Sequence, residues 1–287
     1  MKILITGNNS YIGANFEKWV SKDTNFQIDT VDVREDSWKQ MDFGQYEAIL
    51  NVAAIVHKDY KTIDPALYYK VNRDLAVALA KKAKEEGVKQ FVHMSTMAVY
   101  GLEGKIGKQV IIDWDTPYQP TNPYGKSKVE ADELLLGLAD STFTTSIIRS
   151  PMVYGPNCLG NYVLLSKMVQ KVRIFPAIDN QRSMLYVDNL SEILKQIIEG
   201  REQGIFHPQN TEYVSTRQMV RHIAQAKGIK LYESRLMAVG VKLVGRYIGI
   251  CGKVFGNLTY AQDLTDTVKE SSKEIKLKES IYKIERQ

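Results

Sequence analysis

Two side chains that can exchange a proton lie four residues apart, with Tyr124 preceding Lys128. Residues at this spacing lie on one face of a helix, so the phenol and the ammonium would be neighbours. A nearby cation favours the phenolate and lowers the pKa of the phenol from its ordinary value of about 10. The pair therefore suits general acid–base catalysis, although an amphipathic helix with a half-buried tyrosine would contain the same residues.

A second hydroxyl group is expected near this pair. The sequence STMAVYG at residues 95–101 follows an apolar run that we interpret as a strand, and it begins with Ser95 and Thr96. Active-site residues of open parallel sheets lie beyond the carboxyl ends of the strands. Thr96 is therefore placed to contact a reacting oxygen. For Ser95 we expect an ordinary polar strand end that satisfies its own backbone.

A turn with glycine at both ends, Gly7 and Gly13, joins an apolar run at residues 2–6 to a helical pattern at 14–20. Glycine permits positive φ and a close approach of the backbone to a diphosphate, whose charge then lies at a helix N-terminus. An ordinary strand-to-helix turn would also need glycine. The turn alone is therefore compatible with a dinucleotide site and does not require one.

Asp32 ends the second apolar run, about 20 residues beyond the turn, where a carboxylate can accept hydrogen bonds from the ribose hydroxyls of a dinucleotide. A carboxylate there repels a 2′-phosphate, so NAD is favoured over NADP. Arg34 could pair with a 2′-phosphate and keeps the second cofactor open. A solvated acid at a strand end is the alternative interpretation of Asp32.

The elements that must position these residues follow from short apolar runs that alternate with helical patterns. Helices are predicted at 71–86, which ends in lysines before Gly87, and at 124–138, which Pro123 precedes. The predicted strands comprise residues 2–6, 27–32, 48–54, 90–95 and 144–149. This order predicts an α/β fold with a parallel sheet covered by helices on both faces.

Taken together, these segments resemble the extended short-chain dehydrogenase/reductase family, and within it the NAD-dependent epimerases and dehydratases that act on sugars carried by a nucleotide diphosphate. The turn is similar to the family's Gly-x-x-Gly-x-x-Gly, with Ser10 at the middle glycine, and residues 95–101 resemble its Ser-Ser-x-x-Val-Tyr-Gly segment. The resemblance extends to about residue 189. It implies a Rossmann-type doubly wound parallel sheet with a smaller, interleaved C-terminal substrate lobe.

The resemblance also implies roles for individual residues. Thr96, Tyr124 and Lys128 match the catalytic residues. Thr96, Asn161 and Arg182 match substrate-binding positions, and Arg182 is expected on the diphosphate because a guanidinium presents a fork of donors to phosphate oxygens. The implied cofactor-binding residues are Gly7, Ser10, Tyr11, Ile12, Gly13, Asp32, Asp42, Phe43, Ala53, Ala54, Asn72, Tyr124, Lys128 and Pro151.

The implied activity is NAD-dependent epimerisation of a nucleotide-diphosphate sugar, at C4 of a UDP-hexose or UDP-N-acetylhexosamine, through a transient 4-keto intermediate. An NAD(P)H-dependent reductase of a nucleotide-linked 4-keto-6-deoxy sugar would use the same residues. A non-catalytic dinucleotide-binding sensor is a further alternative. Dehydration is disfavoured because Met97 and Ala98 stand where the family's dehydratases place acids.

The predicted domains are a dinucleotide-binding domain at 1–154, with a return segment near 183–205, and a substrate lobe formed by 155–182 and 206–287. Within the lobe, residues 236–258 are apolar with interspersed Lys and Arg, a pattern that a membrane-surface segment also shows. Five glycines weaken a long-helix interpretation. We expect a packed segment of the lobe.

The chain has 287 residues, of which 44% are apolar, and a net charge of +5 with both signs interspersed, which does not indicate a nucleic-acid surface. Cys158 and Cys251 form neither a disulfide framework nor a metal-ligand spacing, so no metal site is expected. No run approaches the roughly 18 apolar residues of a membrane span. We expect a cytoplasmic protein, and family resemblance implies a homodimer formed through helices 71–86 and 123–138.

Overall fold

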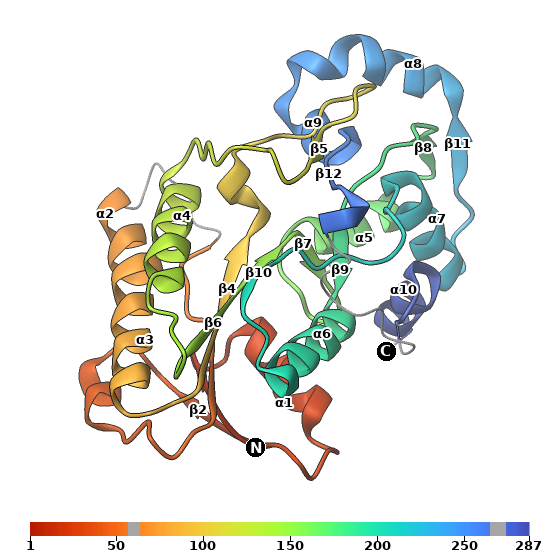
Figure 1. Cartoon of the computed structure of the whole chain (residues 1–287). Coiled ribbons are helices and arrows are strands. Elements are labelled where there is room, and N and C mark those ends of the chain that lie inside the picture. The colour runs from red at the N-terminus through yellow and green to blue at the C-terminus, as the bar shows by residue number, and fades with distance from the viewer. Residues whose placement is uncertain (57–63, 265–273, 287) are drawn as a thin grey trace.

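The computed structural model describes residues 1–56, 64–264 and 274–286, and its central feature is a parallel sheet (Figure 1). Within this part of the chain the sheet has six strands in the order β10-β6-β4-β3-β1-β2, and every neighbouring pair is parallel. The strands are β1 (Lys2–Thr6), β2 (Gln27–Val31), β3 (Ala48–Asn51), β4 (Gln90–Thr96), β6 (Thr144–Ser150) and β10 (Gly204–Phe206). The predicted fold class is confirmed.

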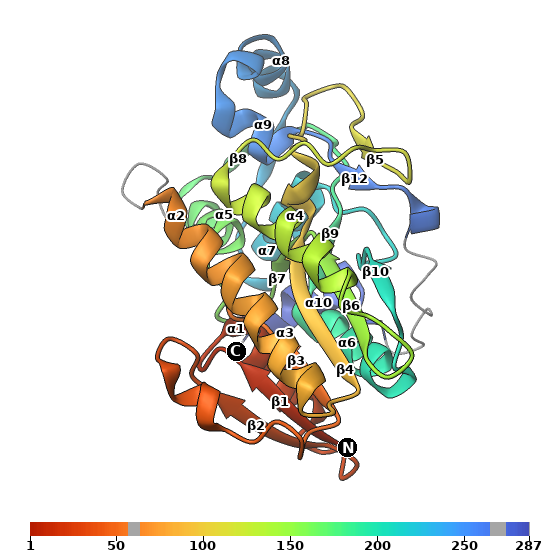
Figure 2. The same ribbon diagram turned by 60° about the vertical axis from the view of Figure 1, so that its left-hand side comes forward.

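Helices cover both faces of the sheet because successive strand residues point to opposite sides and both sides are apolar. Ile3 and Ile5 pack toward α1 (Tyr11–Val20) and α6 (Val187–Gly200). Leu4, between them, belongs to the core under α3 (Ala76–Glu85) and α4 (Pro123–Leu136). Figure 2 shows α3 and α4 side by side on one face. The sheet is therefore doubly wound.

The predicted helix at 71–86 begins earlier than expected, at Pro65. It consists of α2 (Pro65–Tyr68), a π-helical stretch η2 (Tyr69–Leu75) and α3. Asp64 caps it, because its Oδ1 accepts a hydrogen bond from the Ala66 backbone N–H at 2.9 Å. The start was missed because the apolar periodicity is weak there, although an Asp-Pro pair is itself a start signal.

The remaining elements form a second, less regular group beyond the carboxyl ends of the sheet strands. It contains the parallel strand pairs β7–β9, β8–β11 and β12–β5, together with α5, α7 and α10. Their bounds are β5 (Ile111–Ile112), β7 (Met152–Tyr154), β8 (Ile174–Pro176), β9 (Met184–Tyr186), β11 (Tyr232–Ser234), β12 (Thr259–Tyr260), α5 (Asn161–Lys171), α7 (Thr216–Ala226) and α10 (Leu277–Glu285). The chain returns to the sheet at α6 and β10 before it completes this lobe. The lobe is therefore interleaved, while its precise division at 154, 182 and 205 stays a prediction.

Residues 236–258 differ from the expectation of a packed segment. They form α8 (Arg235–Val244), a 3₁₀ turn η4 (Gly245–Tyr247) and α9 (Gly249–Phe255), so the glycines do interrupt a long helix. Ala238 is buried, but Leu236 on the other side of α8 is 83% exposed. The packing expectation is wrong for this outer face, because only one stripe of the helix reaches the lobe core. In the part of the chain that the structure describes, no helix is long and apolar enough to cross a membrane.

Helix α1 approaches β1 closely at Gly13. A Cβ atom at this position would lie 2.6 Å from Ser10 Oγ and 2.9 Å from Ile5 Cγ2. Both distances are shorter than side-chain contacts allow, so only glycine fits between the helix and the strand.

We predict that Gly13→Ala lowers the free energy of unfolding by about 1–3 kcal/mol, the usual cost of overpacking a core. Gly240→Ala is the matched control, because nothing lies within 4 Å of its Cβ position on α8. Alanine there should be neutral or stabilise the helix by up to about 1 kcal/mol. Urea titration measures both, and equal stability of the two variants would contradict the packing described here.

Candidate active site

The glycine turn lies against the carboxyl end of β3. Gly7 has φ +104°, and a Cβ there would lie 3.1 Å from both the backbone N and Cα of Ala53. Ser10 is the N-cap of α1, and its Oγ accepts a hydrogen bond from the Gly13 backbone N–H at 3.1 Å. The structure thus brings Gly7, Ala53 and the start of α1 together in a cradle that suits a dinucleotide diphosphate.

Tyr11 follows this cap and has a hydroxyl group that is buried without a hydrogen-bond partner among the described residues. Burial raises the pKa of Tyr11, so the hydroxyl remains a donor. A Cβ at Gly155 would lie 2.5 Å from this oxygen, which places it where the chain leaves the sheet for the second lobe. An unpaired buried donor is uncommon, and beside the cradle it fits a polar ligand.

Asp32 follows β2 and is held by Arg34. The Arg34 Nε lies 2.9 Å from both carboxylate oxygens, and Nη2 also contacts Oδ2. Hydrogen bonding to Arg34 lowers the pKa of Asp32 to about 2. The Arg34 guanidinium is therefore already bonded to the carboxylate that the sequence assigns to the ribose hydroxyls. It also places a positive charge beside this carboxylate.

Asn72 is buried in the π-helical stretch and joins two segments of the site. Its Oδ1 accepts a hydrogen bond from the Ile55 N–H at 2.8 Å, and its Nδ2 donates to the Ile55 carbonyl at 3.1 Å and to Ser127 Oγ at 3.2 Å. It thereby ties the chain that follows β3 to helix α4. These contacts use both N–H donors of the amide and one acceptor site of Oδ1, and the predicted contact of Asn72 with the cofactor stays a prediction.

Lys128 is buried between α4 and the sheet. Its Nζ donates to the Met94 carbonyl at 2.8 Å and lies 3.4 Å from His93 Nε2. Burial lowers the pKa of Lys128 to about 8. The ammonium is therefore charged below about pH 8 and loses its proton as the pH rises through that value. Only the charged form can favour a phenolate, so the role predicted for Lys128 beside Tyr124 requires a pH below this value.

A chain of polar side chains under Lys128 was not predicted. His93 Nδ1 lies 2.9 Å from Asn51 Nδ2, and Thr6 Oγ1 donates to Asn51 Oδ1 at 2.6 Å. Burial lowers the pKa of His93 well below its ordinary value, so the imidazole is neutral. These three residues sit on β1, β3 and β4 and are fully buried. The polar residues inside these apolar strands were the sequence signal that could have predicted this series of hydrogen-bonded side chains.

Thr96 and Tyr124 come from different elements, and the start of α4 adjoins the turn after β4, since a Cβ at Gly125 would lie 2.9 Å from the Ala98 carbonyl oxygen. Thr96 is the last residue of this strand, and its Oγ1 accepts a hydrogen bond from the Ala98 N–H at 3.1 Å, which leaves the hydroxyl proton to donate. Tyr124 lies in the first turn of α4, which Asn122 caps through a 2.8 Å bond from Gly125 N–H. Both side chains are partly exposed. They are therefore accessible, whereas Lys128 is covered.

The expectation that Ser95 satisfies its own backbone is wrong. Ser95 Oγ donates to Asp132 Oδ2 at 2.9 Å, and Arg149 Nε donates to the same oxygen at 3.0 Å. Asp132 and Arg149 are 0% and 1% exposed. The Arg149 guanidinium also lies 4.3 Å from the ring centroid of Tyr118. The contacts among Ser95, Asp132 and Arg149 attach α4 to β4 and β6. No spacing along the sequence predicted them.

Arg182 lies in the second lobe, where Nη1 donates to the Gly256 carbonyl at 3.2 Å. Burial lowers the pKa of Arg182, and among the described residues no carboxylate is within ion-pair distance of it. A half-buried cation without an anionic partner is suited to binding an anionic ligand. Asn161, the other predicted contact of the substrate, is exposed at the start of α5.

Three further predicted positions are placed by the structure without a test of their roles. Phe43 is fully buried in the core under α3, and Asp42 is exposed, with its Oδ1 accepting from the Gly44 N–H at 2.8 Å. Pro151 is buried between β6 and β7. The contacts of Asp42, Phe43 and Pro151 with a cofactor remain predictions.

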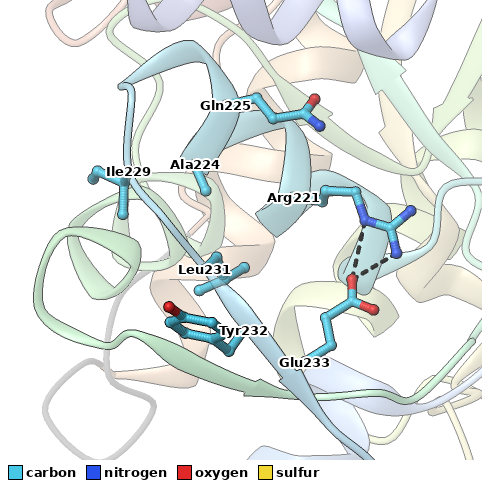
Figure 3. A pocket seen from close by; sticks show the side chains of 7 residues that line it. All are labelled: Arg221, Ala224, Gln225, Ile229, Leu231, Tyr232 and Glu233. Carbon is cyan, nitrogen blue, oxygen red and sulfur yellow. Dashed lines mark hydrogen bonds and ion pairs between the residues drawn. The ribbon is translucent and has the colours of Figure 1, made fainter.

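A separate hollow of about 460 Å³ lies between α7 and β11 (Figure 3) and is lined by Arg221, Ala224, Gln225, Ile229, Leu231, Tyr232 and Glu233. None of the predicted site residues lines it. Arg221 Nε donates to Glu233 Oε1 at 3.0 Å, so its charge is already paired. The hollow is therefore not the predicted active site.

Residues 3–210 match the model of the NAD dependent epimerase/dehydratase family. The chain belongs to this family. It is 28% identical to a UDP-glucose 4-epimerase of Vibrio cholerae over 93% of this chain and 86% of that protein. It is also 28% identical to an N-acetyl-α-D-glucosaminyl-diphospho-ditrans,octacis-undecaprenol 4-epimerase of Escherichia coli O157:H7, over 78% of this chain and 68% of that protein.

Among solved structures, a UDP-glucuronic acid 4-epimerase from Bacillus cereus in complex with NAD shares the fold, with a TM-score of 0.75 and 17% identity over 100% of this chain and 96% of that chain. Family membership confirms that the protein is an NAD-dependent enzyme, as the sequence predicted, and rules against the sensor interpretation. Within the described ranges, no group of three or more His, Cys, Asp or Glu side chains could hold a metal ion.

The Asp32–Arg34 pair predicts opposite effects of two substitutions on cofactor choice. Arg34→Ala frees the carboxylate and removes the cation, so the ratio of NAD to NADP affinity should rise about tenfold, the effect of one exposed charge-assisted hydrogen bond. Asp32→Ala leaves the cation and should lower that ratio by a similar factor. Titration of both dinucleotides measures the ratios. Shifts in the same direction for both variants would contradict the assignment of this site.

Proposed function

We propose that the protein epimerises a nucleotide-diphosphate sugar at C4, with a UDP-hexose or UDP-N-acetylhexosamine as substrate. The observation that carries this proposal is that the start of α4, with Tyr124, lies against the turn after β4, which Thr96 ends, while Lys128 of the same helix is buried against β4. A phenol, a hydroxyl and a cation carried by these adjoining elements suit the removal and return of a hydroxyl proton. The named activity of the Vibrio cholerae relative agrees with this chemistry.

Each residue has a separate task in this mechanism. The cofactor, held by the turn around Gly7 and the start of α1, supplies reversible acceptance of hydride from the sugar carbon. Tyr124 takes the proton from the C4 hydroxyl and later returns it. Lys128 favours the phenolate form of Tyr124, and Thr96 donates a hydrogen bond to the same sugar oxygen.

Epimerisation also requires the keto sugar to present its other face before reduction. Binding the substrate through its diphosphate permits this rotation, because the sugar ring is not held and can turn. Arg182, half-buried and without a carboxylate partner in the described part of the chain, is the residue that we assign to the diphosphate.

Two other reactions of the family, dehydration and net reduction, differ from epimerisation in their products. Dehydration is disfavoured because Met97 is partly buried against apolar residues and Ala98 carries no acid, so neither can move a proton. Net reduction of a 4-keto-6-deoxy sugar would use the same three residues and consume NADH or NADPH. Incubation with a panel of nucleotide sugars, with and without added NADH or NADPH, separates these outcomes by NMR and mass.

A lipid diphosphate is a second candidate carrier of the sugar. The Escherichia coli relative is named for an undecaprenyl-diphosphate sugar, and the exposed apolar face of α8 favours a substrate at a membrane surface. Arg182 would contact the same diphosphate in either carrier. The panel should therefore include a sugar linked through diphosphate to a polyprenol.

We predict that Tyr124→Phe reduces turnover by about 10²- to 10⁴-fold with cofactor and substrate binding retained, because only the ionisable hydroxyl is lost. Lys128→Met should lower turnover and move the pH optimum upward, because the charge that favours the phenolate is gone. It should also weaken cofactor affinity, because a donor to the nicotinamide ribose is lost. Thr96→Val should cause a milder loss. Steady-state rates across pH and dinucleotide titrations measure these effects.

Tyr232→Phe is the control, because this tyrosine is 53% exposed on β11 and lies outside the proposed site. It should keep the original turnover. Near-normal turnover of Tyr124→Phe on the identified substrate would show that the mechanism is wrong, even with fold and cofactor unchanged.

We further propose a homodimer in which α3 and α4 of two copies pack together. These helices form one side of the sheet (Figure 2), and Leu134 on α4 is 50% exposed. Light scattering at micromolar concentration should give the mass of a dimer, and Leu134→Arg should shift it toward the monomer. A monomeric mass for the unchanged protein would refute this interface.

A further inference from the structure

The α8–α9 hairpin, residues 235–255, exposes an unusual concentration of large apolar side chains. They are Leu236 (83% exposed), Met237 (43%), Val239 (54%), Leu243 (64%), Tyr247 (75%) and Ile248 (45%). Apolar residues scattered singly over a surface are ordinary, but a contiguous exposed patch marks an interaction site. All six lie within a stretch of thirteen residues, and Leu236, Val239 and Leu243 recur at helical spacing, so these three adjoin on one side of α8.

The two sides of α8 have different surroundings. Ala238 is buried and Val241 packs beside it against the core of the second lobe. Leu236, Val239 and Leu243 follow one another at helical spacing on the opposite side and face away from that core. The inner stripe therefore anchors the helix, while the outer stripe makes no contribution to the lobe core.

The position of the hairpin leaves this outer stripe accessible. In both views the hairpin forms the extremity of the molecule farthest from the edge strand β2 (Figures 1 and 2). It is held from below by the segment 104–108, where Ile106 packs against the same core and Lys105 bridges to Asn257. These contacts join the inner side of the hairpin to the lobe, while its outer apolar side chains stay exposed.

The charged residues of the hairpin itself are all cationic. No Asp or Glu occurs between Glu233 and Asp263, whereas Arg235, Lys242, Arg246 and Lys253 do. Among the side chains that the structure describes, those of Arg235, Lys242 and Lys253 are exposed.

The neighbouring segment adds the exposed Lys105 and Lys108, with Glu103 as the nearby acid. Glu233, at the base of α8, is already bound to Arg217 and Arg221. The rim of the apolar patch is therefore cationic.

We propose that the α8–α9 hairpin docks the enzyme on an anionic membrane surface. An amphipathic helix with apolar residues on one side and basic residues at its edge lies in the interface of a bilayer, with the apolar side among the acyl chains and the cations at the lipid phosphates. Tyrosine, here Tyr247, is typical of the boundary between the two regions. The enzyme would then be held at the membrane without spanning it.

A second copy of the chain fits this patch less well. A twofold interface brings the same surface of both copies together, so the cations on the hairpin would face their own counterparts. Like charges opposed in an interface are unfavourable, and the hairpin carries no acid to relieve them. A lipid surface supplies the negative charge that a second copy lacks.

Flotation with vesicles tests the proposal on the full chain. The protein should float with vesicles of equal parts phosphatidylcholine and phosphatidylglycerol, bind vesicles of pure phosphatidylcholine weakly, and dissociate from the former at high salt. The double variant Leu236→Ser/Leu243→Ser should bind about a hundredfold more weakly, because two side chains no longer enter the acyl region. Lys242→Gln/Lys253→Gln should weaken binding to the anionic vesicles about tenfold.

Leu159→Ser/Leu164→Ser is the matched control, because these leucines are 86% and 65% exposed but lie in and just before α5, outside the hairpin. It should float like the unchanged protein. Flotation of none of the proteins, or equal losses for both leucine pairs, would overturn the proposal. The proposal would also be overturned if the unchanged protein formed a dimer that did not bind vesicles and only the hairpin variant dissociated that dimer.

Activity separates this proposal from the proposed function. The hairpin variants should epimerise a water-soluble nucleotide sugar at the original rate, since the hairpin contributes no catalytic residue. Loss of vesicle binding with retained turnover supports membrane docking. An enzyme without epimerase activity that still floats through the hairpin would refute only the proposed function.

Discussion

Helix α4 is held against the carboxyl ends of β4 and β6 by an ion pair that is excluded from water. Arg149 on β6 and Asp132 on α4 are 1% and 0% exposed, and Ser95 on β4 shares the same carboxylate oxygen. Burial raises the pKa of Asp132 and Arg149 opposes that effect. Removing one member of such a pair leaves an uncompensated charge, with a typical cost of about 3–5 kcal/mol. The pair therefore fixes the helix that carries Tyr124 and Lys128 beside the strand that carries Thr96.

The same helix is fixed a second time by polar contacts beneath Lys128. Thr6, Asn51 and His93 connect three adjacent strands. The Met94 carbonyl accepts a hydrogen bond from Lys128, whose Nζ lies 3.4 Å from His93 Nε2. Asn72 adds a link from the π-helical stretch to Ser127. Burial lowers the pKa of Lys128 to about 8 although Asp132 opposes the effect, so the charge of the lysine responds to pH in the working range of an enzyme. The polar layer between α4 and the sheet thus both positions the helix and sets the pKa of Lys128.

The second lobe has a different character. Its core is built from aromatic and aliphatic residues of α5, α7, β7 and β9, such as Tyr154, Tyr162 and Tyr186, and it presents Arg182 without a carboxylate partner among the described residues. Its outer end, the α8–α9 hairpin, is apolar and cationic at once. One lobe thus carries both the proposed diphosphate contact and the proposed membrane surface, while the sheet and α4 carry the proton-transfer residues.

The local sequence determined the parts of this protein whose signals are short in range. Strand and helix alternation, the glycine turn and the helical spacing of Tyr124 and Lys128 all depend on neighbours within a few residues, and the fold class followed from them. Pro65 shows where this failed, since a start signal was present but weakly supported by periodicity.

The tertiary structure decided the partners of buried polar groups. His93 and Lys128 are 35 positions apart, and Ser95 and Asp132 are 37 apart, so no local pattern pairs them. It also decided which side of α8 is covered, because periodicity identifies an apolar stripe but not whether a core exists to receive it. Long-range packing sets both, since burial and hydrogen bonding depend on what the rest of the chain places nearby.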